Sequence, residues 1–261
     1  MIRTGEGETL LCLSGGGFRM LECGCGVMQA LEEAGIHVNK YMGSSAGGIL
    51  AGLHASGMSG KDIEELIRRY KASDLIDFNW GMFIPFHKSA VYNRDGMRRV
   101  IADNIIEAMT TRCVTVTATK IYCDRPVSVE MPGKLDSIMA TSAMPEIFDS
   151  EIIDCIEYSD GGVLNNIPLP KVINLPKYAN IIVVMCNDGT EKPLTSAFKA
   201  TRAISWYSDT MLREFTSVME EYTGVPNMTL IWPDPFPSSL LDWSKDHSLI
   251  AYAKDFAKKL L

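Results

Sequence analysis

The stretch Gly43-Ser44-Ser45-Ala46-Gly47 follows a short apolar run and precedes residues 48–53, which are small or apolar. The G-x-S-x-G spacing is typical of a nucleophile elbow, where a serine lies on a tight turn between a strand and a helix. Glycines two positions to either side remove Cβ atoms that would clash where the backbone reverses. Ser45 is therefore the candidate nucleophile. The alternative is an ordinary helix start with Ser44 as its N-cap.

A glycine-rich turn precedes this pentapeptide. Residues 9–13 have the short apolar pattern of a buried strand, Gly15-Gly16-Gly17 follow, and the spacing of apolar residues predicts a helix over 20–34. A dinucleotide fingerprint is disfavoured because Met20 stands where its last glycine would be, and no Gly-Lys-Ser/Thr follows to make a P-loop. The remaining interpretation is an oxyanion hole, which needs a nucleophile nearby.

A second strand over residues 36–42 leads into the pentapeptide. A right-handed crossover places the carboxyl end of this strand beside that of the first strand. The glycine turn and Ser45 should then meet at one edge of the sheet.

The rest of the chain alternates predicted helices and strands. The apolar patterns predict helices from Ser59 and over 93–108, 135–143 and 196–222, a final helix from Asp246, and strands over 113–119, 127–130, 181–185 and 228–232. This alternation predicts an α/β fold: a three-layer α/β/α sandwich with a mostly parallel central sheet. With no internal repeat or linker, we expect one domain over residues 1–261.

Composition excludes several classes of protein. The net charge of -7, without long basic clusters, argues against nucleic acid as a partner. The N-terminus lacks the pattern of a secretory signal and no apolar run is long enough to cross a bilayer, so we expect a cytoplasmic protein. Seven cysteines without a C-x-x-C pair favour reduced thiols over disulfides or a metal site.

Residues 75–92 are aromatic and interrupted by glycine and proline. They have no sustained period, which leaves two interpretations: an apolar lid over the site, or a loop packed on the core. The aromatic residues Phe78, Trp80, Phe83 and Phe86, together with Trp232, Phe236 and Trp243, also suggest a patch for transient peripheral contact with a membrane surface.

Two further blocks follow in the second half of the chain. One is Ala140-Thr141-Ser142-Ala143-Met144-Pro145, where the proline ends a helix. The other is Asp160-Gly161-Gly162, followed by Asn165, Asn166 and Pro168. Taken alone, Asp-Gly-Gly indicates a turn.

The glycine turn, the pentapeptide and these two blocks, in this order, resemble the patatin-like phospholipases over about residues 9–170. The resemblance implies a Ser45/Asp160 dyad that cleaves carboxylic esters of phospholipids or neutral lipids without a cofactor or metal. It also implies an oxyanion hole, with the backbone amides of Gly16 and Gly17 as its main donors. The implied oxyanion-hole residues are Gly15, Gly16, Gly17, Arg19 and Ala46.

One departure from the family pattern is Met20, where the family usually has glycine. The extra bulk would lie near the acyl site and affect substrate size. The dyad itself requires a dry setting, because an ordinary aspartate is a weak base at neutral pH.

Two rival functions stay open at this point. The order Ser45, Asp160, His247 matches that of an α/β-hydrolase triad, so a Ser-Asp-His carboxylesterase is the nearest alternative, although His247 next to Asp246 also suits a solvated helix terminus. A catalytically silent lipid-binding or scaffold protein is the other.

Overall fold

A computed structural model gives the fold of the chain. The residues described are 7–78, 90–121, 125–170, 177–186, 217–218, 220, 222, 224–225, 227–233 and 247–261. Most of the predicted helix over 196–222 and residues 79–89 of the aromatic stretch lie outside them.

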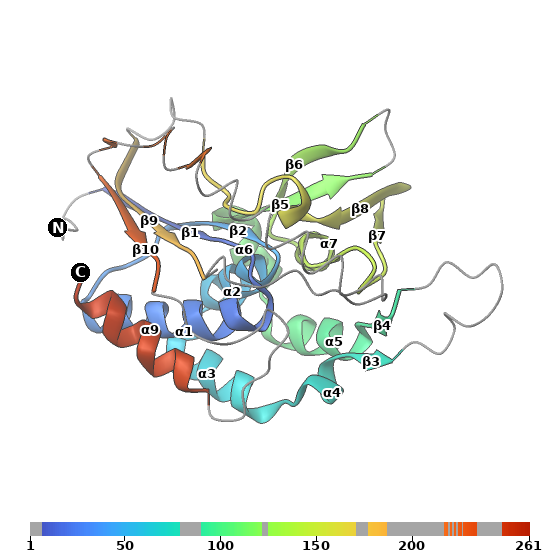
Figure 1. The fold of residues 1–261 in the computed structure, drawn as a ribbon, viewed down its shortest axis with the longest axis horizontal. Helices are drawn as coiled ribbons and strands as arrows, with labels where there is room; N and C mark the ends of the chain where they lie inside the picture. Colours follow the sequence, from blue (N-terminus) through green and yellow to red (C-terminus); the bar gives the residue numbers. More distant parts are fainter. Residues whose placement is uncertain are drawn as a thin grey trace, which may run out of the picture.

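The described residues form a central eight-stranded sheet (Figure 1). Its order is β10-β9-β1-β2-β5-β8-β7, and β6 pairs with β5. The strands from β10 to β5 are parallel, whereas β6, β8 and β7 pair antiparallel to their neighbours. The bounds are β1 Glu8–Leu13, β2 Lys40–Ser44, β5 Val114–Lys120, β6 Val127–Pro132, β7 Glu151–Ile153, β8 Ile156–Asp160, β9 Tyr178–Val184 and β10 Met228–Ile231.

Helices cover one face of this sheet. Figure 1 shows α1 (Gly17–Glu33), α2 (Ala46–Ala55), α3 (Gly60–Arg69) and α9 (Ser248–Lys258) on the same side of the strands. The central strands are buried on both faces, as their continuous apolar runs predict. The main core lies between the sheet and these helices, and α1 supplies much of it because thirteen of its residues are buried.

A second, smaller core lies on the other face. It contains Leu10, Cys12 and Ile181 from the strands, against which Val218 and Tyr222 pack. Ser217 and Val218 are helical. The sheet is therefore covered on both faces, as the predicted α/β/α arrangement requires.

The remaining elements are short. They are α4 (Ala72–Leu75), a two-stranded sheet of β3 (Asp77–Phe78) and β4 (Tyr92–Asn93), α5 (Asp95–Asn104), α6 (Glu107–Cys113), α7 (Leu135–Thr141) and a 3-10 turn over Gly161–Val163.

The predicted helix over 93–108 was wrong in extent. It is divided between α5 and α6, because Ile105 and Ile106 adopt extended conformations. Ile105 packs its side chain against the main core. Burial of one β-branched side chain thus overrides the helical spacing on either side.

Strand β5 aligns the ends of two strands that run toward each other. It pairs with β6 along one edge from Thr115 to Lys120. A strand has two edges, so β2 and β8 share the other: Ser44 of β2 is opposite Thr117, and Asp160 of β8 is opposite Ala118. The carboxyl ends of β2 and β8 therefore meet.

Candidate active site

The turn between β2 and α2 has the geometry of a nucleophile elbow. Ser45 has φ 52° and ψ -125°, a conformation that costs a non-glycine residue free energy. A Cβ atom at Gly43 would lie 2.6 Å from Gly48 Cα, and one at Gly47 would lie 2.3 Å from the carbonyl oxygen of Leu13. Glycine at both positions thus permits this tight turn.

The alternative role of Ser44 as a helix cap was wrong. Ser44 is the last residue of β2, and Ser45 occupies the N-cap position of α2. The Ser45 side chain makes no capping hydrogen bond, which leaves it available for the contact described next.

The Ser45 hydroxyl donates directly to the Asp160 carboxylate. The Oγ–Oδ2 distance is 2.7 Å, and both residues are buried, with Asp160 at 0% exposure. The other carboxylate oxygen, Oδ1, accepts the N–H of Gly162 at 2.8 Å. Asp-Gly-Gly is therefore a turn, as its composition indicates, and one that orients the aspartate.

The residues after α7 contact both members of this pair. The Thr141 hydroxyl accepts the N–H of Ser45 at 2.8 Å. The carbonyl oxygen of Ala143 accepts the N–H of Asp160 and the hydroxyl of Ser159, each at 2.9 Å. The sequence identified this block only by its resemblance and its proline. No local pattern indicated that it holds Ser45 and Asp160.

The glycine turn lies beside Ser45. A Cβ atom added at Gly15 would lie 3.1 Å from Ser45 Cβ and 2.2 Å from the Asn166 side-chain oxygen. The N–H of Gly15 donates to the Asn166 carbonyl at 3.0 Å, so this amide is already engaged. By contrast, the hydrogen bonds of the described backbone do not use the N–H groups of Gly16, Gly17 or Ala46.

Arg19 and Met20 lie in the first turn of α1. Arg19 is buried, and its carbonyl accepts the thiol of Cys186. Met20 is fully buried in the main core. It does not line the apolar cavity described next.

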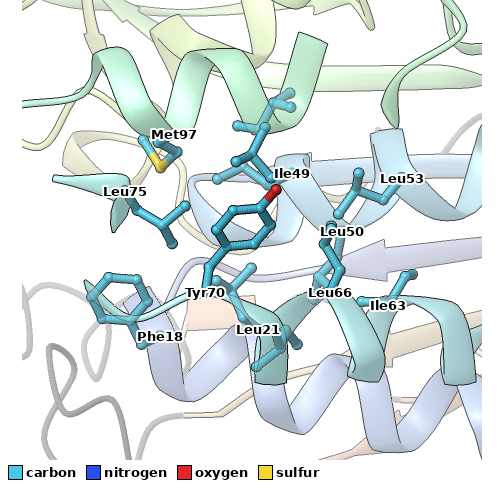
Figure 2. Close-up of a pocket in the computed structure, with 13 residues that line it drawn as sticks. Phe18, Leu21, Ile49, Leu50, Leu53, Ile63, Leu66, Tyr70, Leu75 and Met97 are labelled. Atoms are coloured by element: carbon cyan, nitrogen blue, oxygen red, sulfur yellow. The ribbon is translucent and has the colours of Figure 1, made fainter. Parts of the chain in front are cut away.

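An apolar cavity lies among helices α1, α2, α3 and α5. Figure 2 shows residues of α1, α2 and α3 facing one another, with the Tyr70 ring projecting into the space between them. The cavity measures about 60 Å³, and its lining exposes apolar surface only. Ile49 lies one helical turn beyond Ser45, and Phe18 follows the glycine turn. The lining residues are Phe18, Leu21, Ile49, Leu50, Leu53, Ile63, Leu66, Ile67, Tyr70, Leu75, Met97, Val100 and Ile101.

His247 is paired elsewhere in the molecule. Its Nδ1 lies 2.7 Å from Oε1 of Glu22 on α1, and both side chains are buried. The expectation of a solvated histidine was wrong. The acid and histidine of a triad would have to contact each other, whereas Ser45 and Gly162 donate to the Asp160 carboxylate.

Two predicted absences concern only the part of the chain that the structure describes. There, no group of three or more metal-ligating side chains gathers. Within the same residues, no helix combines the length and apolar character needed to span a bilayer. The six described cysteines are free thiols, although Cys155 is exposed rather than buried.

Comparison with known sequences identifies one family. The model of the patatin-like phospholipase family matches residues 11–173. Patatin-like phospholipase domain-containing protein 6 is 29% identical over 184 residues in both Homo sapiens and Mus musculus, covering 64% of this chain. Uncharacterized protein YqhO of Bacillus subtilis is 31% identical over 99 residues, covering 34% of this chain and 33% of its own.

The chain spans only 13% of the length of the first relatives. Among solved structures, VipD from Legionella pneumophila superimposes with a TM-score of 0.56 at 15% identity, covering 98% of this chain and 67% of VipD. At this identity the similarity establishes a shared fold. That residues 1–261 form one domain stays a prediction.

Proposed function

Because this chain belongs to the patatin-like phospholipase family, we propose that it is a lipid acyl hydrolase that cleaves carboxylic esters through Ser45 and Asp160. The observation that carries the proposal is the direct 2.7 Å hydrogen bond from the Ser45 hydroxyl to the buried Asp160 carboxylate. In this contact the carboxylate can accept the hydroxyl proton without a histidine between them.

The proposed reaction has two stages. Ser45 Oγ attacks the ester carbonyl carbon while its proton passes to Asp160, and collapse of the tetrahedral intermediate releases the alcohol, to which Asp160 returns the proton. Water then attacks the acyl-serine while Asp160 accepts its proton; collapse of this second tetrahedral intermediate breaks the bond to Ser45 Oγ, to which Asp160 returns the proton, and the fatty acid leaves. Burial of Asp160 supports this role, because a carboxylate shielded from water is a stronger base.

The oxyanion that forms in each stage needs hydrogen-bond donors. We assign this role to the N–H groups of Gly16, Gly17 and Ala46, which the described backbone leaves available. Gly15 belongs to the predicted set, but its N–H is bonded to Asn166, so we assign it the close packing of the turn against Ser45. The buried charge of Arg19, two residues after Gly17, adds positive potential at this end of α1.

We assign the apolar cavity to the acyl chain of the substrate. Its lining has no exposed polar surface, which suits the hydrocarbon of an acyl chain. The cavity follows α2 away from Ser45, so a chain lying in it would have its ester carbon at the elbow. Of the residues predicted for a membrane-contact patch, Phe78 is 41% exposed and supports transient contact with a membrane surface, whereas Trp232 packs against the second core.

The test uses the full chain, a mixed lipid extract and a fluorophosphonate probe, which forms a covalent bond with an activated serine. Wild-type protein should release fatty acids and become labelled at Ser45. In Ser45→Ala and Asp160→Asn we expect both signals to fall by about 10³-fold or more, because the nucleophile and its base act as a unit. Mass spectrometry of the products gives head group and position, and circular dichroism checks folding.

Two outcomes favour the rival functions. Folded wild-type protein that is neither labelled nor active would support a silent lipid-binding or scaffold protein. A loss of labelling in folded His247→Gln as large as that in Asp160→Asn would support the histidine triad. The pairing of His247 with Glu22 argues against that result.

A further inference from the structure

Arg94 is a buried cation with four hydrogen bonds. It precedes α5 and is 7% exposed. Nη1 donates to the carbonyl of Met139 at 2.6 Å and to the hydroxyl of Ser142 at 3.1 Å. Nη2 donates to the carbonyl of Asp149 at 2.9 Å and to Glu151 Oε1 at 2.8 Å. All four acceptors belong to one segment of the chain, residues 139–151.

The same segment forms hydrogen bonds with the two candidate catalytic residues, Ser45 and Asp160. Thr141 lies between the two residues that Nη1 contacts, and its hydroxyl accepts the N–H of Ser45. The carbonyl of Ala143, one residue further along, accepts the N–H of Asp160. Arg94 therefore contacts both ends of a segment that also includes Thr141 and Ala143, which bind Ser45 and Asp160.

The flanking residues strengthen this arrangement. The chain before Arg94 runs beside the segment, because the N–H of Tyr92 donates to the carbonyl of Ile147 and Tyr92 forms a parallel bridge with Phe148. The Arg94 guanidinium carbon lies 5.4 Å from the centre of the Phe148 ring, a distance that suits a cation–π interaction.

The charge of Arg94 also acts on the site. Burial lowers the pKa of Arg94, while the carboxylates of Glu151, Asp160 and Asp149 raise it and Arg98 lowers it. An arginine stays protonated despite such burial. Electrostatic interaction is reciprocal, so the guanidinium favours the ionised form of Asp160, which is the form that can accept a proton.

We propose that Arg94 is a positioning residue of the ester hydrolase: its planar guanidinium holds residues 139–151 so that Thr141 and Ala143 fix Ser45 and Asp160. This role rests on the proposed function. It requires arginine, because a lysine ammonium carries the charge but lacks the rigid fork that reaches four acceptors.

The test measures the rate at which a fluorophosphonate labels Ser45, across the pH range in which each protein stays folded. Arg94→Gln should label about 10²-fold more slowly at its optimum, as expected for misplaced reacting groups. The acid limb of its pH profile should move to higher pH, because Asp160 without a nearby cation protonates more easily. Arg94→Lys should label slowly but keep the acid limb of the wild type.

Arg98→Gln is the matched control. Arg98 also pairs with Glu151, but its other partner is Asp136 rather than Met139 or Ser142. It should label at the wild-type rate.

Three outcomes would overturn the proposal. The first is folded Arg94→Gln with a wild-type rate and an unmoved acid limb. If Arg94→Gln does not fold, Arg94→Lys decides, and a wild-type rate in that variant overturns the role. Wild-type protein without labelling removes the proposed function, and this role with it, whereas wild-type labelling with an unaffected variant removes this role alone.

Discussion

At the scale of single residues, Ser45 is held in an unfavourable conformation. A positive φ at a non-glycine residue costs roughly 1–3 kcal/mol and persists only when neighbouring groups enforce it. Here the neighbours are known: the N–H of Ser45 donates to Thr141, and its hydroxyl donates to Asp160. The position of the hydroxyl therefore depends on a residue 96 positions away.

Thr141→Val tests this dependence. Valine keeps the shape of threonine but removes the acceptor, which leaves the buried N–H of Ser45 without its partner. We expect a loss of about 1–3 kcal/mol in the free energy of unfolding, measured in urea. Labelling of Ser45 should also slow, because the elbow can relax. Thr141→Ser retains the hydroxyl and should behave as wild type, and equal rates for both variants would contradict this account.

At the scale of elements, α1 and α9 pack together although they lie at opposite ends of the chain. Apolar residues of both helices, including Leu249 and Ile250, join the main core. At one end of the contact, Glu33 of α1 binds Lys254 at 2.5 Å and Lys258 at 2.6 Å, both on α9.

Glu33→Gln tests the pH dependence of this contact. Lys254 and then Lys258 lower the pKa of Glu33 from its ordinary 4.5 to about 2. A carboxylate with a lowered pKa stabilises the fold above its unfolded value and loses that contribution as the pH falls toward the folded value. We expect the urea midpoint of wild type to exceed that of Glu33→Gln at neutral pH, and the difference to shrink between pH 4.5 and about 2.

Lys259→Gln is the control for this measurement, since Lys259 follows Lys258 in the chain but is not one of the two lysines that pair with Glu33. The difference between its urea midpoint and that of wild type should change little over the same pH range. A pH-independent difference for Glu33→Gln would show that the carboxylate contributes through packing rather than charge.

At the scale of the whole molecule, the helical layer that covers the sheet also encloses the apolar cavity. The cavity lies between helices, so its length is set by how α1, α2, α3 and α5 pack and not by any one of them. Ile49 and Leu53 line it at successive turns of α2, about 6 Å apart along the helix.

Leu53→Trp and Ile49→Trp test the cavity as an acyl site. Each adds bulk to the space, Leu53 farther from Ser45 and Ile49 nearer to it. We expect Leu53→Trp to lower hydrolysis of long-chain esters while sparing short ones. Ile49→Trp should shorten further the longest acyl chain that is hydrolysed efficiently. The measurement is kcat/KM for a series of p-nitrophenyl esters. An equal loss at every chain length would indicate general damage to packing.

Much of the candidate site could be predicted from the sequence because its backbone turns require glycine at particular positions. Gly43 and Gly47 permit close contacts that a Cβ atom would prevent, and such demands appear as fixed spacings around Ser45. The same holds for the glycine turn and for Asp160-Gly161-Gly162. Alternating apolar segments likewise determined the α/β class, because strands buried on both faces must be apolar.

Only the tertiary structure decided how these pieces meet. The sequence did not predict the β7–β8 hairpin, yet β8 runs antiparallel to β5 and thereby brings Asp160 end to end with Ser44. Arg94 and the Glu22–His247 pair left no local signal either, because their partners lie 45 to 225 positions away. Backbone geometry at a turn constrains its own residues, whereas strand register and buried ion pairs depend on the packing of distant segments.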